Sequence, residues 1–218
     1  MLALAVSPAC ATDSHEYARD EYAIIGDGLA PSKRLSLASH GEGEFGDGNF
    51  HVWLMAEPAH RRIMPLADIS SDNNLDTGPN AYHARWSADS RHVAVSFRRE
   101  RHALQLNIYR IEGRRAHPVA GPGLFRAVTS RDIGRQEDIR RGSPELTWTA
   151  PGRFRLKENY LIKTSDPGFM RMLDKYGRIS FRGDDGAIFA EFAAEADGIM
   201  MPGNRYRIVD LRVRKFGE

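Results

Sequence analysis

Residues 82–119 read YHARWSADSRHVAVSFRRERHALQLNIYRIEGRRAHPV, and this stretch decides the fold that the sequence predicts. From His92 to Phe97, apolar side chains alternate with small or polar ones, which is the pattern of a strand with one buried face. The alternation returns from Leu104 to Ile111 after a polar turn. A short strand is expected from Arg115 to Val119, because the proline near its end suits a sheet edge. The stretch therefore predicts three consecutive strands joined by two turns.

The run from Trp86 to Ser96, followed by a polar turn and by the strand residues 106–109 (LNIY), resembles one blade of the TolB-type β-propeller repeat. That repeat, also called WD40-like or PD40, typically reads Trp-Ser-Pro-Asp-Gly, a basic residue, an apolar strand, a polar loop and a strand ending in Ile-Tyr. Here Ala88 stands where proline is usual, and Ser90 stands where glycine is usual. The resemblance covers about one blade, and it implies a propeller-like protein that works by binding.

Two further stretches are similar to this core stretch. In the first, Leu35 takes the place of Val93; in the second, Trp148 takes the place of Trp86. The copies are spaced by about sixty residues, which exceeds the roughly 40–45 residues of a common blade, and long polar loops account for the excess. The sequence therefore predicts an all-β fold of three propeller-like units, fewer than the four blades of a complete propeller. Two alternatives remain: a second copy of the chain could complete the propeller, or the fold could be a β-sandwich.

The remaining segments are mostly expected to be strands, because almost none has the spacing of a long amphipathic helix. These strands are Phe50–Met55, Arg61–Leu66, Tyr160–Lys163, Ile188–Phe192 and a closing strand at Tyr206–Val213. Phe169–Leu173 is expected to be a strand, with the alternative of a short helix that begins after Asp166 and runs through Tyr176. The charged insert Leu124–Arg141 is expected to hold a short helix. Thr12–Glu21 is polar and is expected to be a flexible leader.

Composition places the chain among soluble globular proteins. It has 218 residues, of which 41% are hydrophobic and 28% charged, with a formal net charge of +2. A charge so close to zero gives no reason to expect a nucleic-acid partner or a membrane-surface partner. No segment approaches the ~20 apolar residues of a transmembrane helix. We therefore expect a single β-rich domain over residues 12–218.

The first eleven residues, MLALAVSPACA, predict export from the cytoplasm. An apolar run, Leu2–Val6, is followed by the small-residue cleavage pattern Ala9-Cys10-Ala11, as at the end of a signal peptide. We therefore assign residues 1–11 to a signal peptide and expect a periplasmic or secreted protein. The positive residues that normally precede the apolar run are missing. The alternatives to a cleaved signal peptide are a frayed apolar N-terminus and a lipoprotein in which Cys10 carries the lipid. Cleavage after Ala11 would remove the single cysteine, which excludes disulfides, thiol catalysis and cysteine-bound zinc.

The sequence contains no recognisable motif for a nucleophilic serine, a phosphate-binding loop, a dinucleotide or a zinc protease. One loop begins like a calcium-binding EF-hand, with Asp72, Asn74 and Asp76 at alternate positions. Its glycine, Gly78, comes one position late, and His83 stands where the bidentate glutamate belongs. A second loop, residues 42–49, has oxygen ligands without a known spacing. Turn chemistry explains both loops, so we predict no metal and no cofactor.

The leading functional prediction is a non-enzymatic binding or interaction module whose loops are held on rigid strands. Its partner would be another envelope protein or a second copy of the chain, and we assign no catalytic residue. The alternative is a cell-envelope hydrolase of glycosidase type, using acidic residues such as Asp184 and Asp185. A purely structural envelope protein is a third reading. The three tryptophans could stack on sugar rings or pack in the core: Trp53, Trp86 and Trp148. Since Trp86 and Trp148 occupy equivalent positions before a turn, core packing is favoured for these two.

Overall fold

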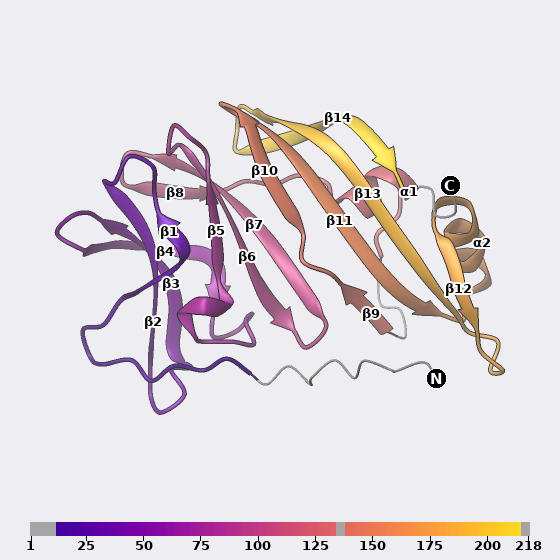
Figure 1. Ribbon diagram of the computed structural model, residues 1–218, viewed down its shortest axis with the longest axis horizontal. Coiled ribbons are helices and arrows are strands. Elements are labelled where there is room, and N and C mark those ends of the chain that lie inside the picture. Colours follow the sequence, from indigo (N-terminus) through magenta and orange to yellow (C-terminus); the bar gives the residue numbers. More distant parts are fainter. Residues whose placement is uncertain (1–11, 134–137, 215–218) are drawn as a thin grey trace, which may run out of the picture.

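The computed structural model describes residues 12–133 and 138–214. Its architecture is three antiparallel four-stranded meanders that follow one another along the chain, from indigo through magenta to yellow in Figure 1. Unit 1 consists of β1 (Ala23–Leu29), β2 (Leu35–Glu42), β3 (Gly48–Ala56) and β4 (Arg61–Ser70). Unit 2 consists of β5 (His83–Trp86), β6 (His92–Glu100), β7 (Ala103–Glu112) and β8 (Arg115–Pro118). Unit 3 consists of β10 (Glu145–Ala150), β11 (Arg153–Thr164), β13 (Ile188–Met201) and β14 (Arg205–Val213).

Unit 2 packs against a neighbour on each of its two faces. Val93 and Val95 of β6 point into an apolar cluster shared with Leu37 and Leu54 of unit 1. Ala94, between them on the same strand, points into a second cluster that includes Phe154 and Leu156 of unit 3. Because successive side chains of a strand point to opposite faces, one strand contributes to both cores. The molecule is therefore a stack of three sheets with two cores.

The backbone connections between the units are slight. β1 meets β5 in one parallel bridge, Gly26 with His83, and the short strand β9 (Asp138–Arg141) lies between β7 and β11. Through these links the strands make one path with β4 at one end and β12 (Arg178–Arg182) at the other, and the path does not close on itself. The all-β prediction is confirmed. The path of strands does not form a complete propeller. The predicted alternative, a β-sandwich, has two sheets, whereas this structure has three layers.

Helices are short in the described residues. α2 (Pro167–Tyr176) begins after Asp166, whose carboxylate accepts the N–H groups of Gly168 and Phe169 at 2.6 and 2.9 Å. The strand predicted at Phe169–Leu173 is therefore wrong, and the helical alternative is confirmed, because the cap and the proline at the first helical position outweigh the short apolar run. The predicted insert helix is α1 (Leu124–Thr129), and a 3₁₀ turn covers Pro79–Ala81. None of the helices in the described ranges has the length and apolar character needed to cross a membrane.

The polar segment Thr12–Glu21 is docked on unit 1, so the prediction of a flexible leader is wrong. Tyr17 is 8% exposed, and its hydroxyl donates to Ser39 Oγ at 2.8 Å. The carbonyl of Asp13 accepts the N–H groups of Thr77 and Gly78 at 2.8 and 2.9 Å. Burial raises the pKa of Tyr17 to about 12. The partners of this segment lie on β2, 22 residues from Tyr17, and in a loop some sixty residues away, so its local composition could not reveal the contacts.

The internal repeat is confirmed as topology, but its register differs by one residue from the sequence alignment. Trp86 pairs with Val93 in unit 2, whereas Leu29 pairs with Ser36 in unit 1. The counterpart of Val93 is therefore Ser36 and not Leu35. A shift of one residue moves a side chain to the other face of its strand, so the outer face of unit 1 is more polar than the alignment implied.

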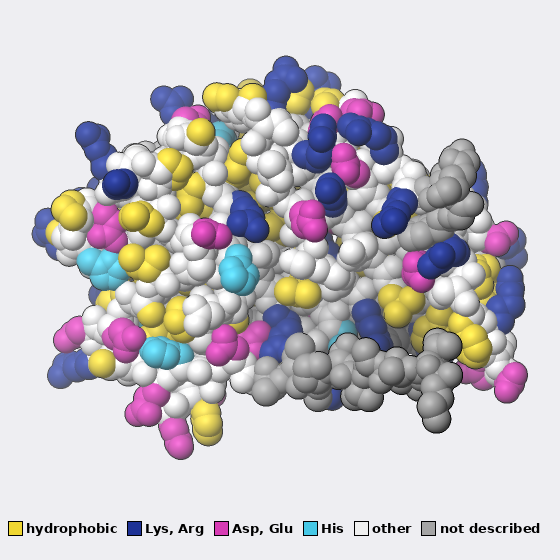
Figure 2. All heavy atoms as spheres, viewed as in Figure 1, with side chains coloured by type: hydrophobic (Ala, Val, Ile, Leu, Met, Phe, Trp, Pro, Cys, Tyr) yellow, Lys and Arg dark blue, Asp and Glu magenta, His cyan; other side chains and the backbone are white. Residues whose placement is uncertain are grey.

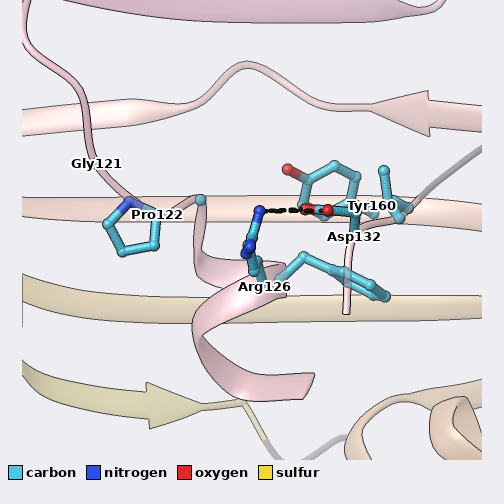
Figure 3. Close-up of a pocket in the computed structure, with 8 residues that line it drawn as sticks. Gly121, Pro122, Arg126, Asp132 and Tyr160 are labelled. Carbon is cyan, nitrogen blue, oxygen red and sulfur yellow. Dashed lines mark hydrogen bonds and ion pairs between the residues drawn. The ribbon is translucent and has the colours of Figure 1, made fainter. Parts of the chain in front are cut away.

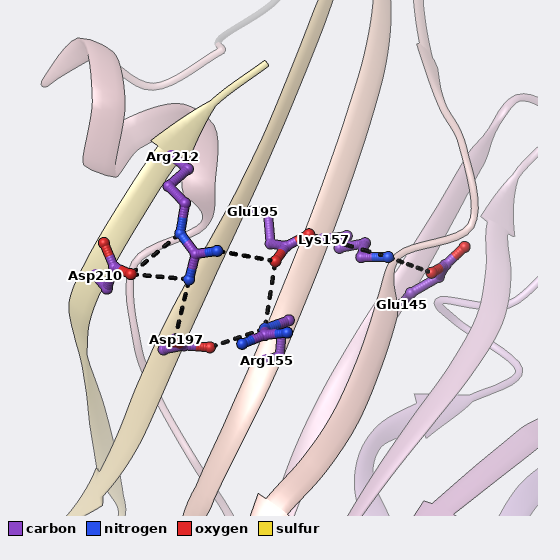
Figure 4. A network of polar contacts seen from close by, with 7 residues as sticks. All are labelled: Glu145, Arg155, Lys157, Glu195, Asp197, Asp210 and Arg212. Atoms are coloured by element: carbon purple, nitrogen blue, oxygen red, sulfur yellow. Dashed lines mark hydrogen bonds and ion pairs between the residues drawn. The ribbon is translucent and has the colours of Figure 1, made fainter.

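The outer face of unit 3 carries a network of ion pairs (Figure 4). Its members are Glu145, Arg155, Lys157, Glu195, Asp197, Asp210 and Arg212. Figure 2 shows basic and acidic side chains gathered over this unit. Arg155 Nε lies 3.0 Å from Asp197 Oδ1, and this hydrogen bond, with the charge of the guanidinium, lowers the pKa of Asp197. Pairs this exposed add little stability, so their main effect is to keep the end of the stack polar.

Candidate functional site

A cavity lies where the first strands of the three units approach one another. We call it the inner groove, and its volume is about 680 Å³. It is lined by residues of β1, β5 and β10 and of the turns that follow these strands: Asp27, Leu29, Pro31, Ala84, Arg85, Trp86, Ala88, Asp89 and residues 146–151. Rigid strands supply most of these residues, which is a good basis for a site with a fixed shape.

Two indoles join the units along this groove. Trp86 Nε1 donates to the carbonyl of Gly28 at 3.1 Å, and Trp148 Nε1 donates to the carbonyl of Arg85 at 2.7 Å. Each tryptophan thus reaches from the first strand of its own unit to the first strand of the preceding unit. The ring of Trp148 also contacts Phe154, with centroids 5.7 Å apart. The predicted equivalence of Trp86 and Trp148 is confirmed, although both are half-buried and not fully enclosed.

Charged groups occupy the rim of the inner groove. Asp27 Oδ2 lies 3.2 Å from Arg85 Nη1, and both side chains are mostly exposed. Asp89 accepts the Ser87 hydroxyl at 2.6 Å and the Arg91 N–H at 3.0 Å. Burial opposes the charge of Asp89, but these two hydrogen bonds prevail and lower the pKa of its carboxyl. The rim therefore presents fixed charges of both signs.

A second candidate is the buried carboxylate of Glu158 between units 2 and 3. Glu158 is 5% exposed and accepts the Leu124 N–H at 2.8 Å, Arg141 Nη2 at 2.6 Å and the Tyr160 hydroxyl at 3.2 Å. Burial, and next the charge of Glu158, raise the pKa of Tyr160 above its usual range. Both carboxylate oxygens have donors, so this group ties α1, β9 and β11 together and is poorly placed to take a proton from a substrate.

Beside Glu158 lies a surface cavity of about 420 Å³ (Figure 3). Arg126 and Asp132 pair across it at 3.1 Å, near the ring of Tyr160. Its wall includes Gly121, where a Cβ atom would lie only 2.2 Å from the ring of Tyr206. Only glycine fits such a close approach of backbone to ring. Because Arg126 and Asp132 are exposed and satisfy each other, this cavity has less to offer a ligand than the inner groove.

Local turn chemistry accounts for only part of the calcium-like loop, because the carboxylate of Asp76 is held by residues distant in the chain. Both carboxylate oxygens of Asp76 are held by Arg98, and one also accepts the Asp13 N–H at 2.9 Å. The amide of Asn74 donates to the carbonyl of Asp76 and to the hydroxyl of Tyr82. The described residues contain no cluster of three or more histidine, cysteine or acidic side chains arranged to hold a metal.

The other residues singled out in the sequence do not converge. Asp185 lies in the turn before β13, where its carboxylate accepts the Ala187 N–H at 3.0 Å and lies 3.5 Å from Lys163 Nζ. The backbone hydrogen bond is the largest cause that lowers the pKa of Asp185. Trp53 lies on the outer face of unit 1, under the guanidinium of Arg62 at 4.9 Å. Its Nε1 and the Nδ1 of His51 are buried without a hydrogen-bond partner in the part of the chain described.

The inner groove could not be recognised in the sequence because its residues are distributed along the chain from Asp27 to Pro151. The only local signal was the repeated tryptophan at the end of a first strand. No family model matches the sequence, and neither a curated protein nor a solved structure was found to be similar. The likeness to a TolB-type blade therefore rests on the residues quoted above.

Proposed function

We propose that the protein is a non-catalytic binding module of the periplasm or the exterior of the cell, and that it holds its ligand in the inner groove. The observation that carries this proposal is the groove itself: a cavity of about 680 Å³ between strands of three units, with a charged rim. Concave sites with an apolar floor and a few fixed polar groups are typical of ligand binding. Indole hydrogen bonds between the units hold the walls in place.

The carboxylates support binding over hydrolysis. A glycosidase needs two carboxyl groups that face one substrate about 5–9.5 Å apart. The two buried carboxylates in the described ranges, Asp76 and Glu158, are each held by an arginine and a backbone N–H. On the groove rim, Asp27 pairs with Arg85, and Asp89 is engaged by its own turn. These contacts suit fixed recognition better than proton transfer.

Export is the part of the proposal that rests on residues 1–11, which lie outside the described residues. We expect the mature protein to begin at Thr12, because cleavage would follow the Ala9-Cys10-Ala11 pattern. Mass spectrometry of the intact protein from its native cells gives the N-terminus directly. A mature protein that still begins at Met1 would contradict export.

The groove is tested by filling it. Thr149 is exposed and lines the groove, so Thr149→Arg should place a long charged side chain there without disturbing the core. When both proteins are immobilised, the variant should retain less material from a cell-envelope extract than the wild type does, by a factor of about ten or more. A tenfold loss of affinity corresponds to about 1.4 kcal/mol of binding free energy. Val209→Arg, at an exposed position of β14 away from the groove, is the matched control and should bind as wild type does. Equal retention by both variants would contradict the groove as the site.

A further inference from the structure

We propose that the ligand of the inner groove is an extended peptide, and that its backbone adds as a strand to the free edge of β10. This inference rests on the proposed function, because it concerns the same groove and names its ligand. It is drawn from a comparison of two junctions in the stack, β1 with β5 and β5 with β10. The two junctions are equivalent in the repeat, but they are closed in different ways.

The junction of β1 with β5 is closed by the backbone. The Gly26 N–H donates to the carbonyl of Tyr82 at 3.0 Å, and Gly26 pairs with His83 in a parallel bridge. Glycine is needed there, since a Cβ atom on Gly26 would lie 2.6 Å from the His83 ring. An extended strand therefore already occupies the edge of β5 on the side of unit 1.

The junction of β5 with β10 has no such backbone pairing in the ranges that the structure describes. β10 pairs with β11 along one edge only, from Glu145 to Ala150. The contact across the junction is made by a side chain, the indole of Trp148 on the Arg85 carbonyl. Residues of both strands, including Ala84 and Thr147, line the groove at this place. The edge of β10 opposite β11 therefore carries no backbone partner in these ranges, and its residues line the groove.

An unpaired strand edge recognises another extended backbone. Its alternating N–H and C=O groups match those of a peptide strand, and main-chain hydrogen bonds then supply affinity without regard to sequence. The edge of β10 is six residues long, which at about 3.3 Å per residue suits a segment of about five or six residues. Side chains of such a segment would alternate between the apolar floor at Leu29, which is 46% exposed, and the Asp27–Arg85 pair on the rim.

The environment of Trp148 favours a peptide over a sugar. Sugar rings bind to an open indole face, but the ring of Trp148 lies 5.4 Å from the ring of His92 and 5.7 Å from that of Phe154. Its N–H is already bonded to the Arg85 carbonyl. The indole therefore serves as a wall of the groove, and the open backbone edge beside it offers the polar groups.

The test uses the full chain and a library of displayed heptapeptides. The tightest selected peptide is synthesised in three versions. One is unmodified, one is N-methylated at the odd positions, and one is N-methylated at the even positions. Alternate N–H groups of a strand point to the same edge, so at least one methylation pattern should weaken binding about tenfold or more, through loss of several main-chain hydrogen bonds. Amide hydrogen exchange at Glu145–Ala150 should slow when the unmodified peptide binds. A peptide that tolerates both patterns, or that leaves this exchange unchanged, would overturn the inference.

Two controls separate this inference from the proposed function. Thr149→Arg should abolish peptide binding and Val209→Arg should not, with thermal unfolding used to show that both variants are folded. If no peptide binds in a manner sensitive to Thr149→Arg, while the envelope extract or a defined oligosaccharide such as chitohexaose does, the peptide inference fails and the groove remains the site. If nothing that binds is sensitive to Thr149→Arg, both fail.

Discussion

Replacing Asp76 with alanine should lower the free energy of unfolding by about 3–5 kcal/mol, the usual effect of removing one partner from a buried ion pair. The side chain of Asp76 is 4% exposed and that of Arg98 is 12% exposed, so water cannot readily replace the lost carboxylate. Asp76 also accepts the Asp13 N–H, which anchors the docked N-terminal segment. Urea denaturation followed by tryptophan fluorescence measures the change, because the midpoint shifts with stability.

Two further variants make this result specific. Asp132→Ala breaks the Arg126–Asp132 pair, whose side chains are 63% and 70% exposed, and it should change stability by less than about 1 kcal/mol. Combining Asp76→Ala with Arg98→Met should recover part of the loss, because the second change removes the guanidinium that the first leaves facing an empty position. If Asp76→Ala were no more harmful than Asp132→Ala, the buried pair would not stabilise the junction of units 1 and 2.

Replacing Trp148 or Trp86 with alanine should each cost about 3 kcal/mol, at the lower end of the range for large aromatic residues because both indoles are half-buried. Each substitution removes ring packing at a junction between units together with an indole hydrogen bond to a carbonyl. A typical domain is stable by about 5–15 kcal/mol, so either loss should be visible as a large shift of the urea midpoint.

The contributions of the ring and of the N–H can be separated. Trp148→Phe keeps most of the apolar contact with Phe154 and removes the donor to the Arg85 carbonyl, so it should cost about 1 kcal/mol. Tyrosine fluorescence or far-ultraviolet circular dichroism follows unfolding in these variants. Alanine substitutions that change stability by less than about half a kcal/mol, as at ordinary surface sites, would refute the packing role and return both indoles to ligand binding.

Local patterns were sufficient to identify most of the strands. The alternation at Val93 and Val95 predicted β6 correctly, since a period of two needs only one buried face to be informative. The polar turn after Trp86 and the second tryptophan at Trp148 identified the repeat. Where two local signals competed, as between the strand and the helix near Phe169, the capping residue Asp166 was the better guide, because it satisfies backbone N–H groups that an apolar run cannot.

Strand periodicity and turn composition depend only on near neighbours, so the sequence was enough to predict an all-β chain of three repeated units. Only the strand pairing fixed the register of unit 1, where Ser36 and not Leu35 matches Val93, since a shift of one residue exchanges the two faces of a strand. The tertiary structure also decided that Tyr17 docks and that Asp27, Arg85 and Trp148 share one groove. These contacts join residues at least 22 positions apart, and whether they form depends on how the strands pair and the three sheets stack, which no local pattern records.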